Sequence, residues 1–316
     1  MPESPFQRQF HARRGHLCNP HVRDLAWLLD SPDLLDRNSR LWQGRIATLF
    51  AHQGGVIDDW LCRLDARPDE LESLIARHGF NRLGRYSELL MAFFLRRLGV
   101  LEAHGLQVRA ESGETVGEFD FLLRGPDSRL LHWEFATKFY LLESQEVAEA
   151  ADAADSFVGP NLADTLGAKM RKILERQLNL SQHSAARAAL PEMPAAAQAL
   201  IKGWLFYPEG GSALVPGVNP VHCRGFWQPL SVFAELQHDC FLILPRLRWL
   251  APARSNPVDC LNRSAVLRAL ESHFAGDDLP VMIALMKPNG GNAVEIERGF
   301  IVSNDWKHRA RQFLRQ

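Results

Sequence analysis

The 316-residue sequence lacks any long run of apolar residues. A helix that crosses a bilayer needs roughly 18 or more such residues in succession, and no segment approaches that length. The first residues, MPESPFQRQF, also lack the apolar stretch of a secretory signal. We therefore expect a protein with no membrane-spanning helix that resides in the cytoplasm.

Cysteine is scarce, and its spacing argues against two kinds of site. The sequence has five cysteines, an odd number, and no two of them are spaced as CxxC. This pattern is typical of reduced thiols and argues against a disulfide framework or a cysteine zinc site. HExxH, P-loop and GxSxG motifs are also absent, so the common zinc-protease, nucleotide-binding and serine-hydrolase signatures do not apply.

The chain also lacks a net charge of either sign. Lys and Arg total 36 against 37 Asp and Glu, which gives a formal net charge of -1. Such a chain does not have the broad electrostatic attraction of a histone-like protein for nucleic acid, although a locally basic groove is compatible with it. The hydrophobic share of 46% and charged share of 23% are typical of a globular protein with a substantial core.

Apolar periodicity predicts a mixed α/β protein in three segments. Residues 1–69 should form an N-terminal helical segment, with helix over about residues 21–50 and a break near Ser31-Pro32. Residues 70–208 should form an α/β core in the order helix, three-strand meander, helix, strand. Residues 209–316 are expected to form a C-terminal α+β subdomain packed on that core.

Turn and capping residues indicate where the elements of the core begin and end. The turn residues GPDS favour an antiparallel hairpin between the second and third strands. The strands expected in the core are 106–110, 118–124, 130–142 and 198–208, and a further strand is expected at 240–250 in the last segment. A helix should run from Leu162 to about Leu180, with Asn161 as its N-cap.

Charged residues follow the pleat of the predicted hairpin. Because side chains alternate between the faces of a strand, Glu118 and Asp120 share one face of the second strand, and Glu134 and Lys138 share one face of the third. If the turn centres near Asp127, Asp120 lies opposite Glu134, whereas a shift of two residues would pair Glu118 with Glu134. Either register holds carboxylates with Cβ atoms about 5 Å apart. A divalent cation such as Mg²⁺ would relieve their repulsion.

A solvated face is the alternative interpretation of these acids. Half-exposed antiparallel sheets commonly have one wet face, and acids there need no function. The unbroken apolar and aromatic character of residues 130–142 instead indicates burial. Together with the shared phase of the charges, it favours a site.

The order of elements and the placement of the acids resemble the PD-(D/E)XK superfamily of restriction-endonuclease-like nucleases, over about residues 70–208. Glu88 in RYSELL matches the acid of the first helix, Asp120 in EFDF the metal-binding Asp, and Lys138 in WEFATKF the strand lysine. More closely, GRYSELL, GEFDFLL, HWEFATKFYL, GPNLADTLGAKM and KGWLFYP look like a bacterial family of uncharacterised proteins, a domain of unknown function assigned by similarity to that superfamily.

One position departs from the superfamily pattern. The usual acid two residues before the lysine is replaced by Ala136, and the nearest acid on that face, Glu134, lies four residues before Lys138. Either Glu134 or Glu118 takes over the missing ligand, or the site is degenerate.

The resemblance implies a restriction-endonuclease-like core that hydrolyses phosphodiesters of nucleic acid with Mg²⁺ or Mn²⁺. Asp120, Glu134 and Glu118 would hold the metal, with Glu88 as a further acid of the site. Lys138 would orient the attacking water or neutralise charge on the phosphate.

The basic helix that follows the third strand offers candidates for nucleic-acid contact. Lys169 and Lys172 in GAKMRKILERQ would bind phosphates, or would belong to a solvated helix face. DNA and RNA are equally compatible with the sequence, and it does not indicate an oligomeric state.

Two classes of function remain open at this point. The first is a metal-dependent nuclease or another nucleic-acid-processing enzyme. The second is a catalytically inactive nuclease-like scaffold that binds nucleic acid or a protein partner, which Ala136 favours. The retained Glu88, Asp120 and Lys138 favour the enzyme, because charges in a mostly apolar sheet are costly without a role.

Overall fold

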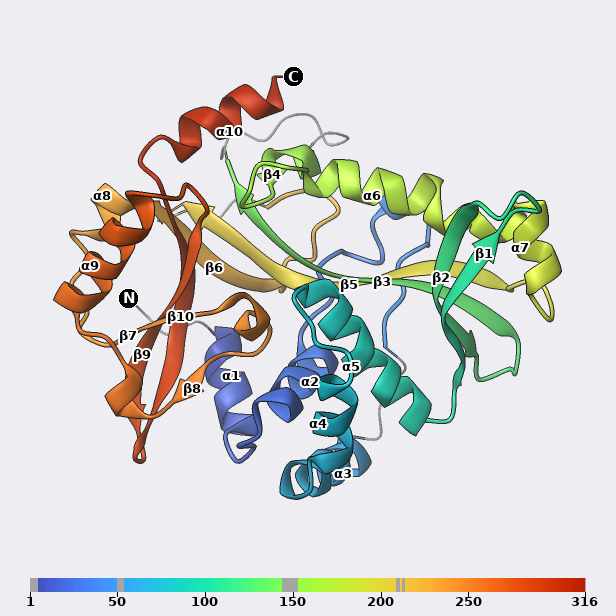
Figure 1. Ribbon diagram of the computed structural model, residues 1–316, viewed down its shortest axis with the longest axis horizontal. Helices are drawn as coiled ribbons and strands as arrows, with labels where there is room; N and C mark the ends of the chain where they lie inside the picture. The colour runs from blue at the N-terminus through green and yellow to red at the C-terminus, as the bar shows by residue number, and fades with distance from the viewer. Residues whose placement is uncertain (1–4, 50–53, 144–152, 209–210, 212–213, 316) are drawn as a thin grey trace.

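The computed structural model describes residues 5–49, 54–143, 153–208, 211 and 214–315. Its central feature is one mixed sheet of ten strands (Figure 1). The strands are β1 (Leu101–Arg109), β2 (Thr115–Arg124), β3 (Leu130–Leu142), β4 (Phe157–Val158), β5 (Ala196–Pro208), β6 (Cys223–Pro229), β7 (Phe241–Ile243), β8 (Arg254–Ser255), β9 (Val281–Asn289) and β10 (Asn292–Val302). The order across the sheet is β1-β2-β3-β5-β6-β10-β9-β7, and β4 and β8 pair with β3 and β10 off this path.

Helices cover both faces of the sheet (Figure 1). The helices of the described residues are α1 (Pro5–Arg14), α2 (Pro20–Asp30), α3 (Gly54–Ala66), α4 (Asp69–Ala76), α5 (Leu83–Arg97), α6 (Leu166–Glu175), α7 (Ser184–Ala189), α8 (Leu230–Phe233), α9 (Arg263–Phe274) and α10 (Trp306–Leu314). Helices α1 to α5 lie on one side of the sheet centre, and α6 lies on the other. None of these helices combines the length and the apolar character that a bilayer span needs.

The alternating side chains of β3 divide the core into two layers. Phe135 and Phe139 pack in the large apolar cluster that includes the N-terminal helices. Tyr140 and Leu142 pack in a second cluster, against apolar residues of α6 such as Met170. Because β3 pairs in parallel with β5 over its length and is covered on both faces, it is the buried centre of the sheet.

The hairpin of β2 and β3 adopts the first of the two predicted registers. Phe121 pairs with Trp133 and Arg124 with Leu130, so Asp120 comes next on β2 at the level of Glu134. The described ladder stops at Phe121. Among the residues that the structure describes, β3 pairs again on this side only at its end, where Leu141 and Leu142 meet β4. Between these two ladders no described strand pairs with this edge of β3, and residues 135–140 line the cleft described below.

The predicted order of elements in residues 70–208 is present, but two helix predictions are wrong in part. The helix expected to reach residue 50 ends at Asp30, and only the short 3-10 turn Arg40–Trp42 follows within the described residues before 50. Helix α6 begins at Leu166 because Thr165 is its N-cap, with the Thr165 Oγ1 atom accepting a hydrogen bond of 3.0 Å from the Ala168 amide. Leu162, the expected start, has a left-handed backbone with φ of 54°.

The C-terminal residues extend the same sheet. β6 pairs in parallel with β5, β10 pairs in parallel with β6, and β9 and β7 follow at the edge. The strand predicted at residues 240–250 is limited to β7, and a 3-10 turn at Arg246–Arg248 replaces the remainder. The fold is therefore mixed α/β, with one sheet that runs through both the predicted core and the C-terminal segment.

Candidate functional site

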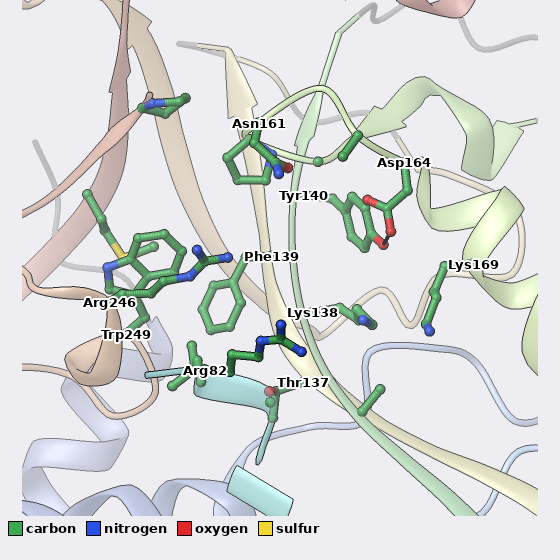
Figure 2. Close-up of a pocket in the computed structure, with 18 of the residues that line it drawn as sticks. Arg82, Thr137, Lys138, Phe139, Tyr140, Asn161, Asp164, Lys169, Arg246 and Trp249 are labelled. Carbon is green, nitrogen blue, oxygen red and sulfur yellow. Dashed lines mark hydrogen bonds between the residues drawn. The ribbon is translucent and has the colours of Figure 1, made fainter. Parts of the chain in front are cut away.

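A cleft of about 980 Å³ lies beside the open edge of β3. Its walls come from the start of α5, from residues 135–140 of β3, from the loop before α6, and from residues 243–249 and 279–282. Figure 2 shows Lys138 and Lys169 on one side of the cleft and Arg246 and Trp249 on the other. One half is therefore rich in charge, and the other is aromatic.

Three carboxylates gather at the charged half. Ligand oxygens of Glu88 on α5 and of Glu118 and Asp120 on β2 lie within 4.8 Å of one another. Two oxygens on opposite sides of a Mg²⁺ ion are about 4.2 Å apart at the usual bond lengths, so small side-chain adjustments would let all three bind one ion. The donor set and its spacing thus fit a hard divalent cation.

A backbone contact fixes Asp120 at the edge of β3. Its carboxylate accepts a hydrogen bond of 3.0 Å from the Phe135 amide. Phe135 lies two residues after Trp133, the last β3 residue in the described ladder with β2. Burial and the nearby carboxylate of Glu134 raise the pKa of Asp120 to about 8, and Glu88 and Glu118 add to the rise. A raised carboxyl pKa of this kind shows that negative charge is poorly compensated at this point.

Arg85 and His104 already contact this acidic cluster. The Arg85 guanidinium lies 3.2 Å from Glu88 and 2.9 Å from Glu118, and His104 Nε2 lies 2.9 Å from Glu88. Hydrogen bonding to Arg85 outweighs the effect of burial and lowers the pKa of Glu118. The Arg85 side chain is 56% exposed, so its ion pairs are screened by solvent and easily broken.

Glu134 is adjacent to the cluster but buried. It is 1% exposed, does not line the cleft, and binds His132 and Gln177 through its two oxygens. Burial raises the pKa of Glu134 to about 7, opposed by hydrogen bonds from Asp120. Burial also lowers the pKa of His132 to about 4, so its ring is neutral at pH 7. The solvated-face interpretation is therefore wrong for Glu134.

Lysines on β3 and α6 supply positive charge in the same cleft as the acids. Lys138 and Lys169 both line the cleft, and Figure 2 shows their ammonium groups close to each other. Burial and repulsion from Lys169 lower the pKa of Lys138 to about 8. Burial and the charge of Lys172 lower the pKa of Lys169. Within the described residues neither Lys138 nor Lys169 forms an ion pair, which leaves both free for an anionic ligand.

The structure brings most of the predicted residues to one place. Four of the predicted residues line the cleft: Glu88, Asp120, Lys138 and Lys169. Glu118 forms the group of three carboxylates with Glu88 and Asp120. The predicted roles of Glu134 as a metal ligand and of Lys172 in phosphate binding stay predictions: Glu134 lies beside Asp120 outside the group of three, and Lys172 is exposed.

Sequence reasoning missed other parts of the site. The missed residues are Arg82, Arg85, His104, Tyr140 and Asp164, the last two joined by a hydrogen bond of 3.1 Å. Only Arg85 had a visible signal, since it lies three residues before Glu88 on a predicted helix.

Residues 23–302 match a family described as a domain of unknown function (DUF1853). Because this match covers most of the chain, the protein belongs to that family, as the sequence motifs indicated. No curated protein and no solved structure matches the chain.

Proposed function

We propose that this protein is a Mg²⁺-dependent phosphodiester hydrolase of nucleic acid with a restriction-endonuclease-like core. The observation that carries the proposal is the meeting of Asp120 and Glu88 with Lys138 in one cleft, at the open edge of a central strand. Carboxylates that fit a divalent cation, next to a lysine without an ion pair among the described residues, are the groups that phosphoryl transfer requires.

The arrangement of the core supports the superfamily relationship. Helix α5, the meander β1-β2-β3, helix α6 and strand β5 follow one another, and β5 pairs in parallel with β3. The acids and Lys138 occupy the helix and strands on which the superfamily carries its site. The β2–β3 ladder does not extend beyond the Phe121–Trp133 pair, and this exposes the edge of β3 beside which the acids and Lys138 lie.

Asp120, Glu88 and Glu118 would hold the metal. A bound Mg²⁺ supplies a water of lowered pKa and positive charge against the phosphate oxygens. The Phe135 amide orients Asp120, and deprotonation of Asp120 is needed before it can act as a ligand. Glu134 lies next to Asp120, and its pKa is raised to about 7. Its carboxyl group would therefore take up or release a proton near neutral pH as the charge in the site changes.

Lys138 would bind the scissile phosphate. With a pKa of about 8 it is mostly protonated at pH 7, so it can donate hydrogen bonds to the non-bridging oxygens. Its charge stabilises the additional negative charge of the transition state more than that of the ground state. Lys169 lies beside Lys138 and would hold the same or the adjacent phosphate.

A specific observation also favours the second function, an inactive scaffold that binds nucleic acid. The Arg85 guanidinium already bridges Glu88 and Glu118, and Ala136 supplies no acid at the usual position. In that case the cleft would retain its phosphate-binding lysines and would take no metal.

Calorimetric titration of Mg²⁺ and Mn²⁺ into the full chain tests the proposal, together with hydrolysis assays on DNA and RNA. We expect binding and hydrolysis in the wild type and loss of both in Asp120→Asn. Lys138→Met should keep metal binding and lose hydrolysis, whereas the exposed control Lys307→Met should keep both. Wild-type protein that binds no metal in the presence of nucleic acid would exclude the hydrolase and leave the scaffold.

A further inference from the structure

We infer that the aromatic half of the cleft binds an unstacked base of a single-stranded nucleic acid, whose phosphates lie on the lysine side. This inference rests on the proposed function, because it names the substrate class of the same cleft. It concerns Trp249, Arg246 and Phe139, to which the metal chemistry assigns no role (Figure 2).

Trp249 is held as a rigid platform. Its indole N–H donates a hydrogen bond of 3.0 Å to the Leu244 carbonyl. Phe139 and Phe300 pack edge-on against its ring, at centroid distances of 5.5 Å and 5.1 Å. Its only polar group is used internally, so the half-buried side chain offers a ligand little besides ring surface. A ring surface of this kind suits the face of a nucleobase.

Arg246 covers the platform loosely. Its guanidinium lies over the Trp249 ring at 5.7 Å from the centroid. The side chain is exposed, and it forms no ion pair with any residue in the described ranges. It can therefore move aside, or stack on the far face of an inserted base while it contacts a phosphate.

Unpaired positive charge runs along the cleft from this platform to the lysines. Arg82, Lys138, Lys169 and Arg246 all line it, and none has an ion pair among the residues that the structure describes. Arginines elsewhere, such as Arg124 and Arg171, pair with nearby acids. Cations left unpaired in one cleft, next to an aromatic platform, match a strand of alternating phosphates and bases.

Double-stranded nucleic acid cannot place a base face on the Trp249 ring. Its bases are stacked inside and expose only their edges in the grooves, so no base face is free to lie on Trp249. The cleft also has the size of a small-ligand pocket, and Phe139 at its centre is only 9% exposed. A base reaches such a position only from a single strand or after it has been flipped out of a helix at a cost.

Fluorescence anisotropy of the full chain in EDTA tests the inference without any contribution from metal. The probes are labelled 12-nucleotide single strands of DNA and of RNA, and a duplex of the same sequence. We expect a single strand to bind at least tenfold more tightly than the duplex. Trp249→Leu should weaken that binding at least about fivefold, the loss expected for one stacked base. Comparison of the DNA and RNA arms identifies the preferred sugar.

Arg246→Gln provides a second variant that does not endanger folding, because the side chain is exposed. It should weaken single-strand binding, whereas Arg268→Gln, an exposed position on α9 outside the cleft, should not. Equal affinity for duplex and single strand would overturn the inference. So would unchanged binding in both cleft variants, binding of a mononucleotide as tight as that of the strand, or no binding of any probe. Metal titration without nucleic acid tests the proposed hydrolase separately.

Discussion

The Asp120 carboxylate accepts a hydrogen bond of 3.0 Å from the backbone amide of Phe135, where β2 and β3 separate. The side chain replaces the backbone acceptor that a longer ladder would have supplied. A buried amide at the edge of β3 is thereby satisfied, and the carboxylate is held in the wall of the cleft. The break in the hairpin and the position of the acid are therefore one structural feature.

The affinity for Mg²⁺ should rise with pH. The pKa of Asp120 is raised to about 8 and that of Glu134 to about 7, so protons occupy this pair at neutral pH and must leave when a cation binds. We expect affinity to increase up to about tenfold per pH unit between pH 6 and 8, and to level off above. Calorimetry in two buffers of different ionisation enthalpy measures the released protons. A flat profile without proton release would show that the metal does not contact Asp120.

Metal-free protein should become more stable when Asp120 is replaced by Asn, and only at higher pH. The folded state holds the pKa of Asp120 at about 8 against 3.8 for the ordinary group, so the folded state binds more protons between these values. Stability then falls as pH rises through this window, and Asn does not titrate. We expect equal melting temperatures near pH 4 and a gain of a few degrees for the variant at pH 8 to 9 in EDTA, since about 1 kcal/mol corresponds to about 2 to 4 °C.

The matched control for this comparison is Asp127→Asn in the turn between β2 and β3. Hydrogen bonding to Arg129 lowers the pKa of Asp127, so its charge is already compensated and its removal should give no gain. A gain in both variants, or in neither, would contradict the burial of uncompensated charge at Asp120.

Arg85 should compete with the metal. Its guanidinium pairs with Glu88 and Glu118, two of the three acids that would bind Mg²⁺. Because exposed pairs are worth at most about 1 kcal/mol each, Arg85→Gln should tighten Mg²⁺ binding by up to roughly fivefold per pair. Titration of Mg²⁺ at fixed pH measures the change. Arg82→Gln, which removes another cleft arginine without such pairs, should change affinity less, and equal effects would show that only the overall charge matters.

Local features narrowed the register of the hairpin to two alternatives, because the pleat fixes which residues share a face but allows a shift of two residues. A turn centred near Asp127 places Asp120 opposite Glu134, and the structure adopts this register and not the one that would pair Glu118 with Glu134. The start of α6 was not predictable in the same way, because Asn161 and Thr165 are both good N-cap residues. The distant Asp155 favours Thr165, since it accepts hydrogen bonds from both the Thr165 hydroxyl and the Ala168 amide.

Tertiary contacts account for the rest of what sequence reasoning missed. Alternation along β3 predicted the face on which Glu134 lies. It did not predict that Gln177, 43 residues later in the chain, donates a hydrogen bond to the Glu134 carboxylate. Arg85 and Glu118 are 33 residues apart, so their contact depends on how α5 packs on the sheet. The aromatic half of the cleft comes from β7 and the turn after it, which lie outside residues 70–208 in the sequence but line the same cleft in the structure.

Restoring the missing acid should separate the two functions. Ala136 is half-buried, lines the cleft and lies two residues before Lys138. If the site binds metal, Ala136→Asp adds a ligand and should tighten Mg²⁺ binding by about tenfold, because affinity follows the number of charged ligands. In EDTA the same substitution should lower the melting temperature, since it adds a carboxylate near Asp120. Ala136→Asn controls for size without charge. A destabilised Ala136→Asp variant that Mg²⁺ does not rescue would indicate that the cleft serves binding alone.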